Sequence, residues 1–266
     1  MKQLNHLRLP FLLLLIIIIV FIVLLIINHS ELLDNDRNYS FQEAIQKQTD
    51  SSVLNTVDRD GEFVNANSRE IERAMRITRD DNKLKYMDIS QQVPMSKQEV
   101  KKMLQGNGIL ENQADAFKEA QDKYQVNIIY LISHARVETA NGNSKLASGI
   151  KEGNNRYYNF FGVGAFDENA IHTGKSYAKE ASWTSPRKAI LGGAKFIRTN
   201  YFDNDQITLY QMRWNPKSPG QHQYASDILW ADKIAKYMQA YYDQFGIKKD
   251  KVRKNFYASK TDWLIE

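Results

Sequence analysis

Residues 128–147 read IIYLISHARVETANGNSKLA. Residues 128–139 are mostly apolar on every face of a helix, which predicts a helix that is buried over most of its surface. Glu138 stands near the carboxyl end of that helix, directly before a turn of small residues. Apolar surroundings and the negative end of a helix dipole both disfavour an ionised carboxylate. The stretch therefore predicts a buried helix that ends on a side chain suited to donating a proton.

The segments on either side of this helix also show mainly helical spacing. A serine and a glutamate at Ser96 and Glu99 form a capping-box pattern. Further helices are predicted over residues 68–78, 96–105, 113–124, 186–197 and 225–244. Residues 154–183 are instead rich in aromatic, glycine and polar residues, which is typical of short strands and loops. The predicted fold class is α+β, mainly α-helical, with a small β lobe.

The amino terminus carries a long apolar run. Residues 9–27 contain no charged residue, and a helix over them would be roughly 28 Å long, close to the thickness of the hydrocarbon core of a bilayer. A cleaved signal peptide is the competing interpretation, but the run is longer than the usual signal core and no A-x-A-like site follows it. We interpret residues 9–28 as an uncleaved transmembrane signal-anchor, although a buried core helix is the alternative for any apolar helix.

The charges that flank the run predict its orientation. Lys2 and Arg8 precede it, whereas Glu31, Asp34 and Asp36 follow it. Because basic residues stay on the cytoplasmic side, the amino terminus is expected in the cytoplasm and the rest of the chain outside the cell membrane. Single-pass, extracellular localisation is therefore the expectation.

The chain divides into five predicted segments. Residues 1–8 are a cytoplasmic stub and residues 9–28 the membrane span. Residues 29–66 are polar, with scattered apolar residues, and are predicted to be a linker or stalk. Residues 67–85 form an amino-terminal helical extension, and residues 86–266 are the predicted catalytic domain.

Composition excludes several classes of function. The formal net charge of +5 is too small and too dispersed for nucleic-acid binding. There is no cysteine, and the five histidines have no metal-ligand spacing, so neither a catalytic metal nor another cofactor is expected. The absence of a G-x-S-x-G elbow also disfavours an acyl-transfer triad.

Several motifs follow the first stretch in a recognisable order. They are NFFGVG at 159–164, WTSP at 183–186, MRWNP at 212–216 and HQYASD at 222–227. Together with the helix that ends at Glu138, they resemble the glucosaminidase family of bacterial autolysins, glycoside hydrolase family 73, over about residues 86–245. With the apolar run included, the chain resembles the membrane-bound staphylococcal members. Ala140 and Asn143 stand where glycine and threonine are frequent in the family.

The resemblance implies a lysozyme-like fold and hydrolysis of the β-1,4 bond after N-acetylglucosamine in peptidoglycan. It implies that Glu138 is the general acid and that Tyr224 is the active-site tyrosine, where its hydroxyl would orient the acetamido group or stabilise charge at the sugar ring. Two-carboxylate hydrolysis asks for a partner across the bond. The loop-like stretch offers Asp167, Glu168 and Glu180 for this second group, of which Asp167 and Glu168 are preferred, and participation by the substrate's own acetamido group is the alternative.

Five further residues are candidates for binding the substrate. Among the aromatic residues, Phe161 and Trp183 are expected to face the cleft, and Trp214 is a further candidate for stacking on a sugar. Asn159 is expected either to bind an N-acetyl group or to cap a turn. His134, four residues before Glu138 on the same helix face, would tune the acid or serve as a structural hydrogen-bonding residue.

Three functions remain open from the sequence. They are a glucosaminidase that acts on nascent strands, a lytic transglycosylase or muramidase on the same scaffold, and a non-catalytic glycan-binding scaffold. The expected partners are peptidoglycan strands and the membrane. A polytopic membrane protein that contacts the span and residues 31–85 is a further candidate partner.

Overall fold

The computed structural model describes residues 16–19, 39–164, 170–249 and 251–258. Of the apolar run predicted to cross the membrane, only residues 16–19 are described, and they are helical; the rest of that prediction lies outside the described residues. No helix within the described part of the chain combines the length and the apolar character needed to cross a bilayer.

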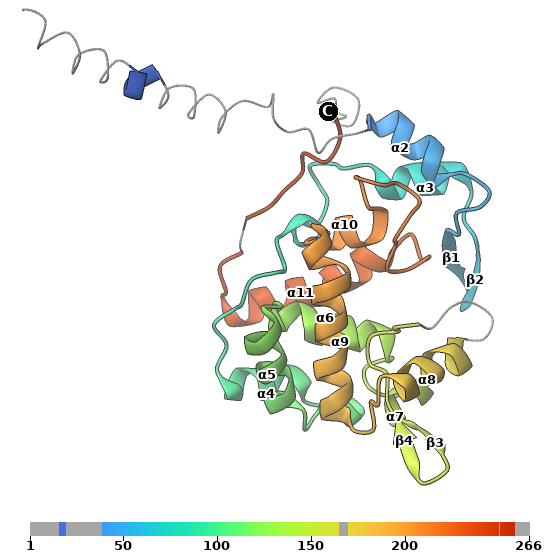
Figure 1. The fold of residues 1–266 in the computed structure, drawn as a ribbon, viewed down its shortest axis with the longest axis vertical. Helices are drawn as coiled ribbons and strands as arrows, with labels where there is room; N and C mark the ends of the chain where they lie inside the picture. The colour runs from blue at the N-terminus through green and yellow to red at the C-terminus, as the bar shows by residue number, and fades with distance from the viewer. Residues whose placement is uncertain (1–15, 20–38, 165–169, 250, 259–266) are drawn as a thin grey trace, which may run out of the picture.

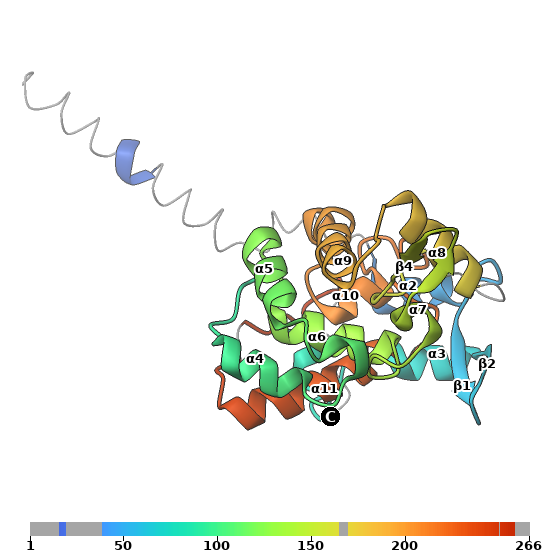
Figure 2. The same ribbon diagram turned by 90° about the horizontal axis from the view of Figure 1, so that it is seen from below.

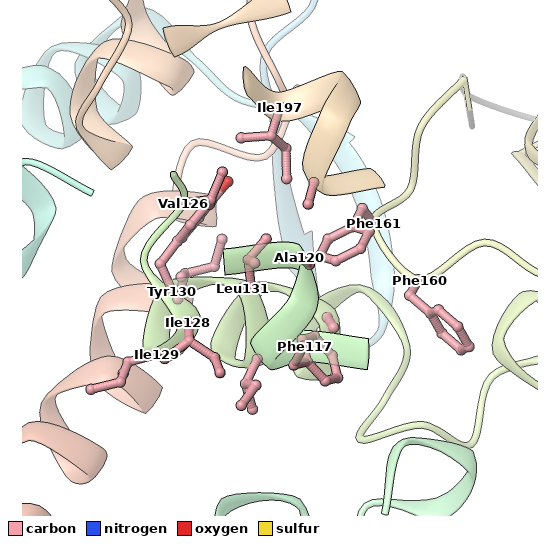
Figure 3. Close-up of a cluster of buried hydrophobic side chains, with 14 of the residues drawn as sticks. Phe117, Ala120, Val126, Ile128, Ile129, Tyr130, Leu131, Phe160, Phe161 and Ile197 are labelled. Carbon is pink, nitrogen blue, oxygen red and sulfur yellow. The ribbon is translucent and has the colours of Figure 1, made fainter. Parts of the chain in front are cut away.

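A helical body surrounds α6 (Ile128–Glu138), the helix predicted from the opening stretch. Every residue from Ile128 to Ala135 is buried, so the expectation of a helix buried on most faces is confirmed. The helices around it are α4 (Lys97–Leu104), α5 (Ala114–Tyr124), α9 (Pro186–Asn200) and α11 (Trp230–Phe245). Apolar side chains of α5 and α6, including Phe117 and Leu131, form the centre of this core (Figure 3).

The β lobe is small and partly helical. Strands β3 (Ile150–Glu152) and β4 (Asn155–Tyr157) form an antiparallel hairpin beside α7 (Lys145–Ser148) and α8 (Ala170–Glu180) (Figure 1). Glu152 on β3 forms ion pairs with Lys175 and Lys179 on α8. Sequence reasoning predicted the strands of this lobe but missed α8, because residues 154–183 were interpreted together as strands and loops.

Residues 39–66 fold against the domain, so the prediction of a linker is wrong for this part of residues 29–66. The segment forms α2 (Phe41–Gln48), β1 (Thr56–Arg59) and β2 (Glu62–Asn65), and α3 (Ser68–Met75) follows. Apolar side chains of this segment are buried in a second cluster together with residues from later in the chain. The cluster consists of Phe41, Ala44, Ile71, Met75, Ile77, Tyr86, Tyr210, Trp214, Ile228 and Tyr257. Low average hydrophobicity concealed this cluster in the sequence.

The described carboxyl-terminal segment completes the same cluster. The Ala258 N–H donates to the Tyr39 carbonyl at 3.0 Å, and the Arg253 N–H donates to the Tyr86 carbonyl at 2.8 Å. The hydroxyls of Tyr257 and Tyr210 are 2.8 Å apart. The two ends of the described domain are thus held side by side by backbone and side-chain hydrogen bonds.

Strands β1 and β2 form a tight hairpin that docks onto the chain before α11. The turn residues Asp60 and Gly61 have φ of 56° and 90°, as a two-residue type I′ turn requires. The Thr56 N–H donates to the Ser226 carbonyl, and the Ile228 N–H donates to the Thr56 carbonyl, both at 2.9 Å. Since residues 226–228 pair with β1, α11 begins at Trp230 and not at residue 225 as predicted.

Short elements link the amino-terminal part to the helical body. They are η2 (Lys83–Tyr86), η3 (Gly108–Leu110), η5 (Phe202–Asn204) and α10 (Leu209–Trp214). Arg213 on α10 is completely buried. Its guanidinium donates to the carbonyl oxygens of Asp227 and Ser226 and to the side chains of Gln223 and Asn55. One cation therefore joins α10, the loop before α11 and the amino-terminal extension.

Candidate active site

Glu138 is the last residue of α6, and its carboxylate is held from two sides. The indole N–H of Trp230 donates to Oε1 at 2.9 Å. Oε2 lies against Gly162, where an added Cβ would be only 2.6 Å from that oxygen. About 23% of the Glu138 side chain is exposed, so the carboxylate is fixed in place and still open to solvent.

Gly162 is required at this position for two reasons. Its φ of +64° lies in the left-handed region, which side chains with a Cβ rarely adopt. Any Cβ would also collide with the Glu138 carboxylate. The glycine of the NFFGVG motif therefore allows the loop to approach the acid closely.

The turn after α6 is also built for close approach. Ala140, Asn141 and Gly142 all have positive φ, which reverses the chain directly after the helix. The Gly142 N–H donates to Thr139 Oγ1 at 2.8 Å. A Cβ on Gly142 would meet the Asn107 carbonyl oxygen at 2.2 Å, so glycine lets the turn pack against the loop before η3.

Tyr224 and Glu138 both contact the same residue, Trp230. Its ring stacks on Trp230 with centroids 5.0 Å apart, and Trp230 is the residue that binds Glu138. Burial, with smaller contributions from Tyr130 and the Glu138 carboxylate, raises the pKa of Tyr224 well above its usual value. The phenol is therefore neutral at physiological pH, and it donates to the Phe161 carbonyl at 2.8 Å.

His134 is buried beneath this group and does not reach a substrate. Its side chain has no exposed surface, and its ring lies between Phe161, Tyr224 and Trp230. Nδ1 is 3.1 Å from the Tyr130 hydroxyl, and Nε2 is 3.4 Å from Glu138 Oε1. His134 is thus a packing residue behind the acid, which corrects its expected place among substrate-binding residues.

Phe161 and Trp183 were expected to face the cleft, but their side chains are 0% and 5% exposed. Both rings pack against α9, where two adjacent glycines make room for them. A Cβ on Gly193 would lie 2.0 Å from the Phe161 ring, and one on Gly192 would lie 2.0 Å from Trp183 Nε1. Both side chains pack the loops that carry them against α9, so neither ring is exposed to a sugar.

Asn159 and Trp214 are also interior residues. Asn159 is 2% exposed, and its amide donates to the carbonyls of Val163 and Gly174 while its oxygen accepts from the N–H groups of Phe161 and Val163. It holds the loop at 159–164 in shape, as the turn-capping alternative supposed. Trp214 is 1% exposed in the second cluster, with the Arg213 guanidinium 3.9 Å from its ring centroid.

The candidates for the second carboxylate, Asp167 and Glu168, lie outside the described residues. Glu138 and Tyr224 both contact Trp230, and their catalytic roles stay predictions. Sequence reasoning missed Trp230 and Gly162, which hold the acid. The signal for Trp230 was its place a few residues after the HQYASD motif, within the helix predicted over residues 225–244.

Comparison with known proteins agrees with this geometry. The family model described as "Glucosaminidase: Mannosyl-glycoprotein endo-beta-N-acetylglucosaminidase" matches residues 114–243. The structure described as the catalytic mutant E138A of Staphylococcus aureus autolysin E in complex with the disaccharide NAG-NAM is 60% identical, with a TM-score of 0.79, and the match covers 84% of this chain and 99% of that chain. The chain therefore belongs to the glucosaminidase family, and its fold is a mainly helical α+β fold of the lysozyme-like type.

Two further relatives show the breadth of the family. Glucosaminidase B of S. aureus is 37% identical, with a TM-score of 0.62 over 85% of this chain and 92% of that chain. The bifunctional autolysin of Staphylococcus epidermidis is 50% identical over 194 residues, which are 68% of this chain. The match spans only 14% of the length of that autolysin.

Proposed function

We propose that this protein is a peptidoglycan hydrolase, an endo-β-N-acetylglucosaminidase that cleaves the β-1,4 bond between N-acetylglucosamine and N-acetylmuramic acid. The observation that carries the proposal is the Glu138 carboxylate, which is fixed between Trp230 and Gly162 and remains open to solvent. The catalytic mutant E138A of autolysin E, which binds the disaccharide NAG-NAM, supports the same role for Glu138 here.

In this proposal Glu138 protonates the glycosidic oxygen as the bond breaks, as a general acid does in glycoside hydrolysis. Trp230 and Gly162 fix the carboxyl group, so little conformational freedom is lost when the substrate binds. Tyr224 contributes through the Phe161 carbonyl, because its hydroxyl holds the loop that carries Gly162 against the acid. Asp167 and Glu168 stay the candidates for the second group of the reaction.

The new ends of digested strands test the proposed bond specificity. Purified, undecorated glycan strands treated with the protein should show reducing-end N-acetylglucosamine when they are analysed by mass spectrometry. Reducing-end N-acetylmuramic acid would instead identify a muramidase, and anhydro-muramic ends would identify a lytic transglycosylase. Unchanged strands would favour the non-catalytic glycan-binding scaffold.

We further propose that the apolar run anchors the enzyme in the cell membrane, with the catalytic domain outside. The described part of the domain begins at Tyr39, and residues 29–38 lie between it and the proposed span. Even fully extended, these residues reach at most about 36 Å. The domain would therefore meet glycan strands close to the membrane, where they are newly made, and trim them. A polytopic membrane partner beside the anchor is compatible with this placement.

Strand length in cells tests the anchoring proposal. In a strain that lacks the gene, the full chain should restore normal glycan strand length, whereas the domain without residues 1–28, supplied from outside, should not. Chromatography of released strands measures the result. Restoration by the external domain would show that position near the membrane is not required.

A further inference from the structure

The β1–β2 hairpin stands next to the acid although it lies outside the matched family region. It pairs with residues 226–228 through Thr56, and Trp230, which binds Glu138, follows directly. Figures 1 and 2 both place the hairpin on the same side of the molecule as α8 and the β lobe. The hairpin therefore belongs to the surroundings of the site and not to a remote face.

The hairpin presents one large aromatic side chain to solvent. Phe63 is 56% exposed, although most large aromatic side chains of the described domain are buried. It lies opposite Asp58 in the hairpin register, and directly opposed residues point to the same face of a sheet. Val57 and Val64 occupy the other face, and Val57 packs on the second cluster. Phe63 thus projects from the face that the second cluster does not cover.

A contact with α11 fixes where Phe63 lies. The ammonium of Lys233 is 5.3 Å from the centroid of the Phe63 ring, and the same ammonium forms an ion pair with Asp227 at 2.6 Å. Lys233 is three residues after Trp230, so the two side chains leave the same face of α11. Phe63 therefore contacts a side chain that lies one helical turn after Trp230, the residue that binds Glu138.

Two further features favour a binding role over a chance exposure. The hairpin is held to residues 226 and 228 by two backbone hydrogen bonds of 2.9 Å, so the ring is presented on a fixed support. Leu229, between the docked residues and Trp230, is itself 41% exposed. The Phe63 ring and the Lys233–Asp227 ion pair offer apolar and polar contacts side by side.

We propose that Phe63, with Lys233 and Leu229, forms a distal subsite that binds an N-acetylhexosamine unit of the glycan strand, beyond the sugars next to the cleaved bond. The inference rests on the proposed function. The C–H face of a pyranose ring packs on an aromatic ring, while its hydroxyl and acetamido groups meet the Lys233–Asp227 pair. Short substrates would not reach Phe63, so the subsite would select for longer strands.

Binding by full-length Glu138→Gln protein tests the subsite without turnover. Addition of Phe63→Ala should raise the Kd for long glycan strands by about threefold to tenfold, the loss typical of one aromatic contact. The Kd for a disaccharide should not change. Phe63→Tyr, which keeps the ring, should bind long strands as tightly as the parent protein. Isothermal titration calorimetry measures all of these values.

Val252→Ala is the matched control, since Val252 is also exposed, at 40%, but lies on the carboxyl-terminal segment opposite Met87. It should leave both Kd values unchanged. An unchanged Kd for long strands in Phe63→Ala would overturn the subsite, and so would an equal loss for long and short ligands. If the protein with Glu138 intact failed to cleave any strand while Phe63→Ala still weakened the binding of long strands, only the proposed hydrolysis would fail.

Discussion

Glu138→Gln is expected to reduce kcat on glycan strands by about 10²–10⁴-fold, the usual contribution of a general acid. Glutamine has nearly the same shape, and its carbonyl oxygen still accepts the Trp230 hydrogen bond. The amide has no proton to transfer to the glycosidic oxygen. The expected loss is therefore in kcat, with KM little changed, and product release from purified strands measures it.

Glu111→Gln is the control for this substitution. Glu111 is an exposed residue that follows η3, so its replacement should leave kcat within about twofold of the parent value. Circular dichroism and thermal unfolding should show that both variants are folded. Full activity in folded Glu138→Gln would exclude Glu138 as the proton donor.

Arg213→Met is expected to lower the free energy of unfolding by about 3–5 kcal/mol, because four buried hydrogen bonds are lost and each contributes roughly 1 kcal/mol. Burial lowers the pKa of Arg213 to about 9, with Asp227 opposing part of that shift, so the guanidinium is charged at neutral pH. Methionine fills similar space but removes one of the two donors to each of the carbonyls of Ser226 and Asp227, which keep the N–H groups of Thr56 and Trp230. Urea unfolding measures the loss.

Arg198→Met is the matched control for the stability measurement. Arg198 is 28% exposed, and its Nε is 3.6 Å from Asp203 Oδ1. Because solvent screens such a pair, the loss should stay below about 1 kcal/mol. Equal losses in the two variants would show that the buried network of Arg213 contributes no more than a surface ion pair.

The helical frame was predictable because its signals are local. Each signal lies within the helix that it predicts. These signals are the capping box at Ser96 and Glu99, the apolar stretch of α6 and the proline that opens α9. The amino-terminal extension was not predictable in this way. Phe41 and Met75 belong to a cluster whose other members, such as Tyr257, come from distant parts of the chain, and no local pattern shows that they meet.

In the candidate site, too, the residues in local motifs were predictable and the contacts between distant parts of the chain were not. Glu138 and Tyr224 stand in motifs, and the structure brings them together on Trp230. The motifs could not show which aromatic residues face outward, because Phe161 and Trp183 are buried by Gly193 and Gly192 of a helix further along the chain. Phe63 was overlooked because it lies in a segment interpreted as linker.

The hydrogen bond between Ala258 and Tyr39 couples the two ends of the described domain. Tyr257 fills space beside Phe41, with ring centroids 5.3 Å apart. Shortening the protein at its carboxyl end would therefore be felt first at α2, more than two hundred residues earlier. A tag or fusion joined directly at Tyr39 or at Ala258 would leave the domain at the same corner, which suits immobilisation by one edge.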